Sequence, residues 1–350
     1  MVHCPHDGRC LNTTARCRAG ASSFPAIAVA FDCGAQLNVN QISPRTHEPY
    51  LQRLARTSKA SGASALFMVP RPALQPVRLP PATTKTLQQW GWTLVETAWV
   101  TPPRLHPTVA MLAEGTGCCG AREFHKLHAL GIDAPIDSVV LLDTDIDILG
   151  DDDNDRVGVG VGGGSWGHRG DSDAMSATNT LRTLFDCAAS GFVLSTRGVR
   201  SPANGGLWAF LPSASLLSRL LLELSHAQPQ AVDGWNASGW GALGASDGRG
   251  PQPYYGAFSF QGFAYWAFYQ SSLLRHGAFR TRSSSSAAVT TAIRAAQLDP
   301  CVWNLQVSSV VASTLCAHRN AREVRVHHAA QGKGIERSHR ARHPTTPNSK

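Results

Sequence analysis

The amino-acid sequence predicts an α/β fold with a central, mostly parallel sheet, and three observations support this prediction. Short apolar runs of strand length alternate with segments of helical spacing through residue 142. The fourth apolar run leads directly into a cluster of aspartates. The chain has 350 residues, 43% of them hydrophobic and 16% charged, so it is long enough to bury a sizeable core.

Four apolar runs are the predicted parallel strands, and each is followed by polar or turn-forming residues. They span 26–31, 65–70, 92–100 and 138–142. Segments with helical spacing or helix-end signals separate them, and these are predicted as helices at 48–63, 83–91 and 122–130. Strands joined by helical crossovers are typical of a parallel sheet, whose ligands bind outside the carboxyl ends of its strands.

The second half of the chain is less regular. Residues 151–180 are rich in Gly and Asp and are expected to form a flexible insertion. A further strand is predicted within 204–213, followed by an apolar helix at 213–227 and an aromatic-rich helix at 261–274. No internal repeat is visible.

These elements predict one domain. We expect it to span residues 26–335, with a disordered or targeting segment at 1–25 and a disordered basic tail at 336–350.

The net charge of +8 raises the possibility of nucleic-acid binding. Half of this excess lies in the stretch from Lys333 to Lys350, which holds five cations and one anion. The aromatic residues lie in core-like helices rather than among basic residues, so we expect no specific nucleic-acid binding. A nucleic-acid-associated protein remains an alternative on the basis of the tail alone.

The odd number of cysteines, nine, and the lack of a C-x-x-C pair argue against a disulfide framework, so we expect mostly reduced thiols. No run of 18 apolar residues occurs, so no transmembrane helix is expected. Neither cytoplasm nor Golgi lumen is favoured by the sequence.

The aspartates after the fourth strand are the strongest sign of a functional site. Residues two apart on an extended chain point to the same side, so Asp143 and Asp145 are expected to converge while Thr144 points away. Converging carboxylates repel one another unless a positive charge lies between them. A hard divalent cation, Mn²⁺ or Mg²⁺, that keeps positions open for phosphate oxygens suits this arrangement.

Several motifs then occur in the order found in one family. "FHKLHAL…DSVVLLDTDIDIL" resembles the Lys-Leu helix, apolar strand and Asp-x-Asp of glycogenin-like glycosyltransferases, which belong to family 8 and have the Rossmann-like GT-A fold. "NGGLWAFLPS" resembles the Asn-x-Gly strand of that family, and "FQGFAYWAF" its Asp-Gln-Gly helix. "VWNLQVSS" and "VRVHHAAQGKG" resemble its Tyr-Asn-Leu stretch and its terminal His-x5-Lys motif. The matches span about residues 120–335.

The resemblance implies a role for each matching residue. Asp143, Asp145 and His327 would hold the metal ion with the diphosphate of a UDP-sugar, and His328 is the alternative to His327. Lys126 and Lys333 would lie near the phosphates of that donor, and Asn204 and Gln261 would contact the sugar being transferred.

The implied activity is transfer of a sugar from a UDP-sugar to a hydroxyl group, with retention of configuration and with Mn²⁺ or Mg²⁺. The acceptor is a glycan, a small alcohol or a protein. In the family an acidic residue precedes Gln-Gly, and Phe260 stands at that position here. This departure favours the alternative of a nucleotide-sugar binder that no longer transfers. Asp247, in the loop before this helix, is a candidate replacement for the acid.

Overall fold

The computed structural model describes most of the sheet and its helices. The described residues are 17–30, 48–71, 79, 81–114, 119–132, 134–144, 146–148, 177–198, 201–227, 235, 256–271, 278–281, 289–303, 305–306 and 326–328.

Seven strands form the main sheet, in the order β10-β6-β7-β4-β1-β2-β3. They span Pro25–Ala30 (β1), Ser64–Pro70 (β2), Thr93–Thr97 (β3), Ser138–Leu142 (β4), Phe192–Thr196 (β6), Leu207–Phe210 (β7) and Arg294–Leu298 (β10). Strand β7 runs antiparallel to β4 and β6, and the other neighbouring pairs are parallel. The predicted α/β fold with a mostly parallel sheet is therefore confirmed.

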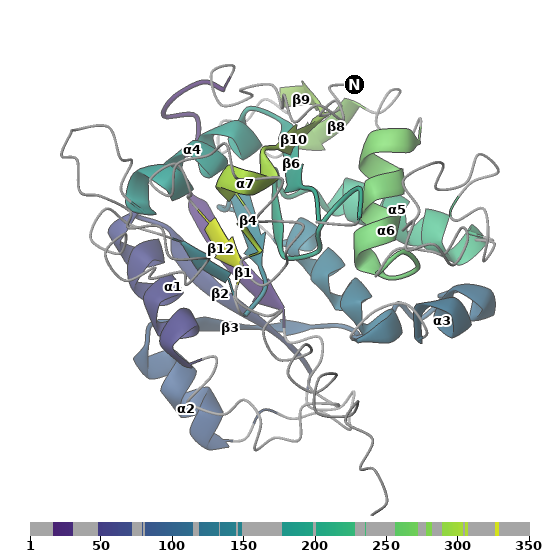
Figure 1. Cartoon of the computed structure of the whole chain (residues 1–350), viewed down its shortest axis with the longest axis horizontal. Coiled ribbons are helices and arrows are strands. Elements are labelled where there is room, and N and C mark those ends of the chain that lie inside the picture. Colours follow the sequence, from purple (N-terminus) through teal and green to yellow (C-terminus); the bar gives the residue numbers. More distant parts are fainter. Residues whose placement is uncertain are drawn as a thin grey trace, which may run out of the picture.

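Helices pack on both faces of this sheet (Figure 1). The helices whose buried side chains pack against one face of the sheet are Glu48–Ala60 (α1), Pro81–Gln89 (α2), Ala177–Ala189 (α4) and Pro300–Trp303 (α7). The helices that pack against the other face are Pro107–Glu114 (α3), the 3₁₀-helix Gly120–Gly131 (η4), Ala214–His226 (α5), Phe260–Tyr265 (α6) and the π-helix Trp266–Gln270 (η7). No helix among the described residues is long and apolar enough to cross a membrane.

The two cores follow from the alternation of side chains along each strand. In β1, Ala26 and Ala28 belong to the core under η4 and α5, whereas Ile27 and Val29 belong to the core under α1 and α4. Because β1 is buried on both faces, its sequence is a continuous apolar run. Trp208 of β7 is fully buried on the η4 side.

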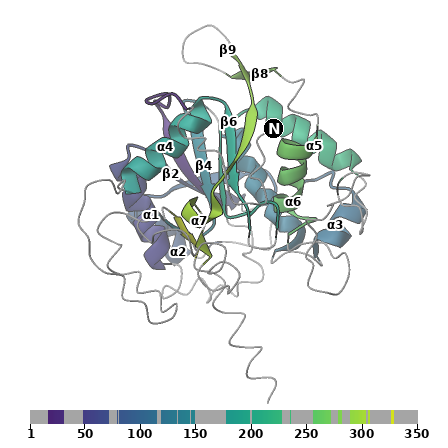
Figure 2. The ribbon, with the colours of Figure 1, turned by 45° about the horizontal axis from the view of Figure 1, so that its top comes forward.

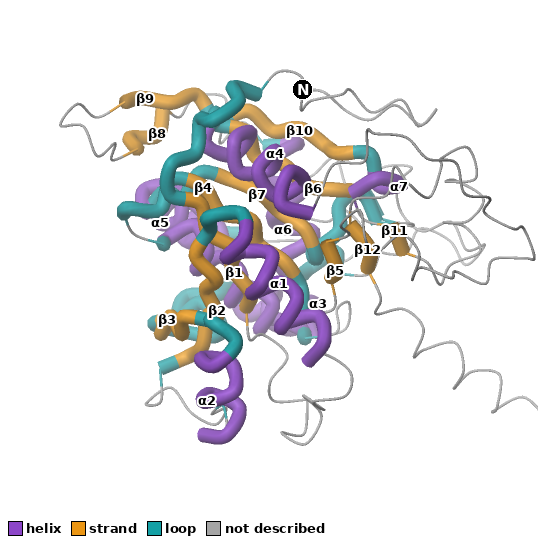
Figure 3. Tube along the Cα trace, turned by 90° about the vertical axis from the view of Figure 1, so that its left-hand side faces the viewer, coloured by secondary structure: helices purple, strands orange, loops and turns teal. Residues whose placement is uncertain are grey.

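Two smaller sheets complete the fold. Ile146–Ile148 (β5), Leu305–Gln306 (β11) and Val326–His328 (β12) lie side by side beyond the end of β4 (Figure 3). Ala278–Thr281 (β8) and Val289–Ala292 (β9) pair as an antiparallel ribbon that projects from the start of β10 (Figure 2).

Several predicted boundaries differ from those of the structure. Helix α4 begins at Ala177, so the last residues of the predicted 151–180 insertion are helical, while 151–176 lie outside the described residues. The sequence analysis assigned neither this helix nor β6. The predicted helix at 261–274 is a short α-helix that continues as a π-helix and ends at Gln270.

The N-terminal segment from Cys17 to Phe24 packs on the domain, although the sequence placed the domain boundary at residue 25. A disulfide joins Cys17 to Cys187 of α4. The Asp186 carboxylate accepts hydrogen bonds from the backbone N–H groups of Gly20 and Ser22, at 2.9 and 3.1 Å. Cys119 and Cys301 each also take part in a disulfide. The expectation of mostly reduced thiols was therefore wrong, because spacing along the chain does not reveal which cysteines meet in space.

Candidate functional site

The residue that follows β4, Asp143, is held at the carboxyl edge of the sheet. Its backbone N–H donates to the carbonyl of Gly206 at 3.0 Å, which extends the β4–β7 pairing by one residue. Its side chain is 27% exposed, and Oδ1 lies 2.7 Å from Lys126 Nζ. This carboxylate therefore reaches solvent on one side while its other side pairs with a buried cation.

Lys126 lies on η4, and its side chain is only 6% exposed. Besides Asp143, its ammonium contacts the carbonyl of Gly205 at 3.5 Å and lies 5.8 Å from the centre of the Phe260 ring. A buried ammonium group is stable only with a nearby anion and hydrogen-bond acceptors. The surroundings of Lys126 supply both, so a fixed positive charge lies at this edge of the sheet.

The segment from Asn204 to Gly206, just before β7, contacts both Lys126 and Gln261 through Gly205. Asn204 Oδ1 accepts from the N–H of Gly206 at 2.6 Å, and the carbonyl of Asn204 accepts from Trp208 Nε1 at 2.8 Å. A Cβ at Gly205 would lie 3.6 Å from Lys126 Nζ and 3.4 Å from Gln261 Oε1. The glycine therefore leaves open the space beside both side chains.

Gln261, in the first turn of α6, completes this corner. Its Oε1 accepts a hydrogen bond from the N–H of Gly205 at 2.8 Å, and the residue is 8% exposed. The turn before α6 is tight: Gly256 has a φ of +74°, and a Cβ at Gly262 would overlap the carbonyl of Ala257. The backbone therefore fixes where this glutamine lies.

Phe260 belongs to the core at this position. It is 3% exposed and packs edge-to-face on Trp208, with ring centres 5.7 Å apart. Edge-to-face aromatic pairs add to the stability gained from burial. An aromatic residue instead of the family's acid thus fits the local packing.

Four predicted site residues therefore meet, although they come from four distant parts of the sequence: Lys126, Asp143, Asn204 and Gln261. The roles assigned to them remain predictions. Sequence reasoning missed Gly205, whose N–H and carbonyl both contact this group. The Asn-Gly-Gly sequence was the available signal, because glycine allows close backbone approach.

The other predicted ligands are only partly described. Strand β12 pairs antiparallel with β5, which places the backbone of His327 opposite Asp147 and that of His328 opposite Ile146. The histidine strand therefore runs beside the residues that follow the Asp-x-Asp motif. The side chains of both histidines, as well as Asp145, Asp247 and Lys333, lie outside the described part of the chain. Within the described part, no three acidic, His or Cys side chains form a metal-binding group.

Helix η4 also carries a histidine that remains neutral at physiological pH. The rings of His128 and Trp99 pack at a tilt of 39°, with ring centres 3.9 Å apart, and His128 Nε2 donates to the carbonyl of that tryptophan at 2.9 Å. Burial lowers the pKa of His128 from 6.5 to about 4, more than the carbonyl hydrogen bond raises it. Burial therefore disfavours the cationic form of His128.

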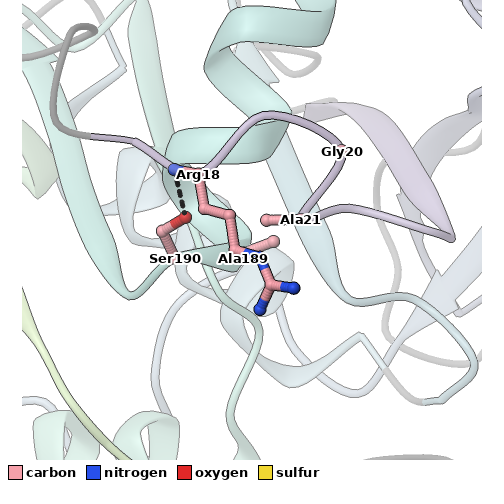
Figure 4. A pocket seen from close by; sticks show the side chains of 5 residues that line it. All are labelled: Arg18, Gly20, Ala21, Ala189 and Ser190. Atoms are coloured by element: carbon pink, nitrogen blue, oxygen red, sulfur yellow. Dashed lines mark hydrogen bonds between the residues drawn. The ribbon is translucent and has the colours of Figure 1, made fainter.

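A surface hollow lies at the opposite, amino-terminal edge of the sheet (Figure 4). It is lined by Arg18, Gly20, Ala21, Ala189 and Ser190, and the backbone N–H of Arg18 donates to Ser190 Oγ at 3.2 Å. None of the predicted site residues lines it.

Comparisons with known proteins give similar solved structures but no sequence match. No protein-family model and no curated protein sequence matches this chain. A glycosyltransferase involved in glycosylation of the major capsid of PBCV-1 is similar at a TM-score of 0.38 and 8% identity, over 91% of this chain and 100% of that one. Mouse xyloside xylosyltransferase 1 is similar at a TM-score of 0.45 and 12% identity, over 89% of this chain and 100% of that one.

A third structure, the bifunctional glycosyltransferase WbbM, is similar at a TM-score of 0.39 and 9% identity, over 88% of this chain and 46% of that one. All three neighbours are glycosyltransferases.

Proposed function

We propose that this chain is a glycosyltransferase that binds a UDP-sugar and transfers the sugar to a hydroxyl acceptor. The observation that carries the proposal is the ion pair of Lys126 and Asp143 at the carboxyl edge of the sheet, beside Gly205 and Gln261. An acidic and a basic side chain at this edge suit a ligand that is both anionic and metal-bound, as a nucleotide diphosphate is.

A divalent metal ion is part of the proposal. The two oxygens of a carboxylate offer several lone pairs, so the ion pair of Asp143 with Lys126 is compatible with coordination of a cation by the same carboxylate. The proposed ligands are Asp143, Asp145 and His327, with His328 as the alternative. Mn²⁺ or Mg²⁺ bound there would neutralise the diphosphate and stabilise it as a leaving group.

The chain's own residues would orient the donor. Lys126 and Lys333 supply positive charge to the phosphates, which favours departure of UDP. Gln261 and Asn204 contact the sugar, and retention of configuration follows from the family resemblance. The bond from the anomeric carbon to the diphosphate breaks, with the electron pair leaving on the diphosphate, and a bond from the anomeric carbon to the acceptor oxygen forms. The proton of the acceptor hydroxyl goes to an oxygen of the departing diphosphate. The acceptor is a glycan, a small alcohol or a protein.

One observation favours a second candidate, a nucleotide-sugar-binding protein without transfer activity. Phe260 occupies the position of the family's acid and is buried against Trp208. Such a protein would bind UDP-sugars through Lys126 and Asp143 and release no UDP.

The disulfide between Cys17 and Cys187 bears on the compartment. Disulfides persist in oxidising compartments and are rare in the cytosol. Of the two compartments left open by the sequence, the Golgi lumen is therefore the one we propose.

A panel of UDP-sugars with Mn²⁺, scored for UDP release with and without EDTA, tests the proposal. We expect release from at least one donor and its loss with EDTA. Glu223→Gln, which breaks a surface ion pair with Arg219 on α5, is the control for removal of a carboxylate, and it should match the parent. Binding of UDP-sugars without any release of UDP would identify the second candidate, and a lack of binding would contradict both.

A further inference from the structure

A buried hydrogen bond behind the site joins η4 to the start of α6. Ser259, the residue just before α6, donates from its hydroxyl to the carboxylate of Glu123, and the same hydroxyl lies 3.0 Å from the carbonyl oxygen of Gly256. Glu123 is 5% exposed and Ser259 is fully buried. A buried carboxylate is costly without hydrogen bonds, and hydrogen bonds to a charged group are strong. This hydrogen bond therefore holds Ser259 in place against η4.

The helix type of η4 connects Glu123 to Lys126. In a 3₁₀-helix, side chains three positions apart leave the same side of the helix, and runs as long as Gly120–Gly131 are uncommon. Glu123 and Lys126 are three positions apart. This single face of η4 therefore binds α6 through Glu123 and Asp143 through Lys126.

The start of α6 leaves little freedom between Ser259 and Gln261. The N–H groups of Ser259 and Gly262 both donate to the carbonyl of Gly256, at 3.2 and 3.0 Å. Two residues after Ser259, Gln261 accepts from the N–H of Gly205. A shift of Ser259 is therefore passed on to Gln261.

We propose that Glu123 and Ser259 form a clamp that positions Gln261 beside Lys126 and so shapes the corner that receives the donor's sugar. This inference rests on the proposed function. Both residues are buried and act through Gln261 and Lys126, so they are positioning residues. The clamp affects recognition of the sugar more than that of the diphosphate, because its loss frees α6 while the pair of Lys126 and Asp143 remains.

The test compares the affinities for UDP and for a UDP-sugar, both with Mn²⁺, by calorimetry on the full chain. In Ser259→Ala we expect the affinity for UDP to stay within about twofold and that for the UDP-sugar to fall about tenfold, the effect of one lost positioning hydrogen bond. Ser259→Thr keeps a hydroxyl and should restore the ratio of the two affinities. Glu123→Gln should add little to the loss in the Ser259→Ala background, because the two residues act as a unit.

Ser213→Ala is the matched control. Ser213 is the residue before α5, and its hydroxyl accepts from the N–H of Leu216 at 3.2 Å. This substitution should lower the melting temperature without a change in the ratio of the two affinities, as a purely structural role would.

Two results would overturn the inference, and they are distinguishable. If the parent binds neither UDP nor any UDP-sugar, the proposed function fails and the clamp's role fails with it. If the parent binds both and the ratio is unchanged in folded Ser259→Ala, the clamp alone is wrong. Should Ser259→Ala not fold, an unchanged ratio in Glu123→Met, which removes the acceptor, decides against the clamp in the same way.

Discussion

Lys126 Nζ lies 2.7 Å from Asp143 Oδ1, and the two residues come from a 3₁₀-helix and from the end of a strand in the centre of the sheet. The sequence suggested that the aspartates repel one another until a metal ion binds. The ion pair supplies a positive charge to Asp143 without a metal. Removal of either partner should therefore cost the other the close counter-ion that this pair supplies.

We expect Asp143→Asn to weaken Mn²⁺-dependent UDP binding at least tenfold and to lower stability by roughly 1–3 kcal/mol, since Lys126 loses its counter-ion in a site that solvent partly reaches. Lys126→Met in the same background should recover part of this stability, because the lone charge is then gone. Calorimetry and denaturant unfolding measure the two effects. Unchanged Mn²⁺–UDP affinity in Asp143→Asn would contradict the metal assignment.

Replacement of both Cys17 and Cys187 by Ser should reduce stability by about 2–4 kcal/mol, because the disulfide joins residues 170 positions apart and restricts the unfolded chain. Affinity for UDP should not change, since the bond lies at the edge of the sheet opposite the site. Thermal unfolding and calorimetry test both points. A melting temperature equal to that of the parent would show that the bond adds no stability.

The stability of the protein should decrease as the pH falls from about 6.5 to about 4, in part because of His128. Its pKa is lower in the folded state, so the unfolded chain binds more protons in this window and protonation favours unfolding. Denaturant unfolding at several pH values gives the slope. His128→Phe should flatten this slope. Equal slopes in the parent and His128→Phe would refute this assignment.

Phe260→Asp distinguishes an enzyme from a binder. The new carboxylate would lie near Lys126, and the contact between the rings of Phe260 and Trp208 would be lost. We expect a loss of stability of about 3 kcal/mol, typical of large-to-small changes at buried aromatic residues. If the site is active, turnover should stay equal or rise, because a carboxylate near the anomeric carbon stabilises positive charge.

Phe260→Leu controls for the loss of the ring alone, and UDP release and melting temperature are measured on the same preparation. A folded Phe260→Asp variant that binds UDP yet, like the parent, releases none from any sugar donor would mean that the chain is a binder.

The sequence determined the features that depend on local pattern. Apolar runs predicted β1, β2 and β4, because strands buried on both faces have little choice of side chain. The edge strand β3 was also predicted, although it is only partly buried. The position of Asp143 at a strand's carboxyl end followed from the same pattern. Family motifs identified Lys126, Asn204 and Gln261, and these residues do lie together around Gly205.

Only the tertiary structure decided how distant segments meet. Three contacts show this: the pairing of Lys126 with Asp143, the disulfide from Cys17 to Cys187 and the hydrogen bond of Ser259 with Glu123. Each joins two different elements of the fold, and the last two join segments far apart in the chain. No local pattern encodes such contacts, because they depend on how the helices pack on the sheet. The 3₁₀ geometry of η4, which places Glu123 and Lys126 on one face, could not be read from helical spacing either.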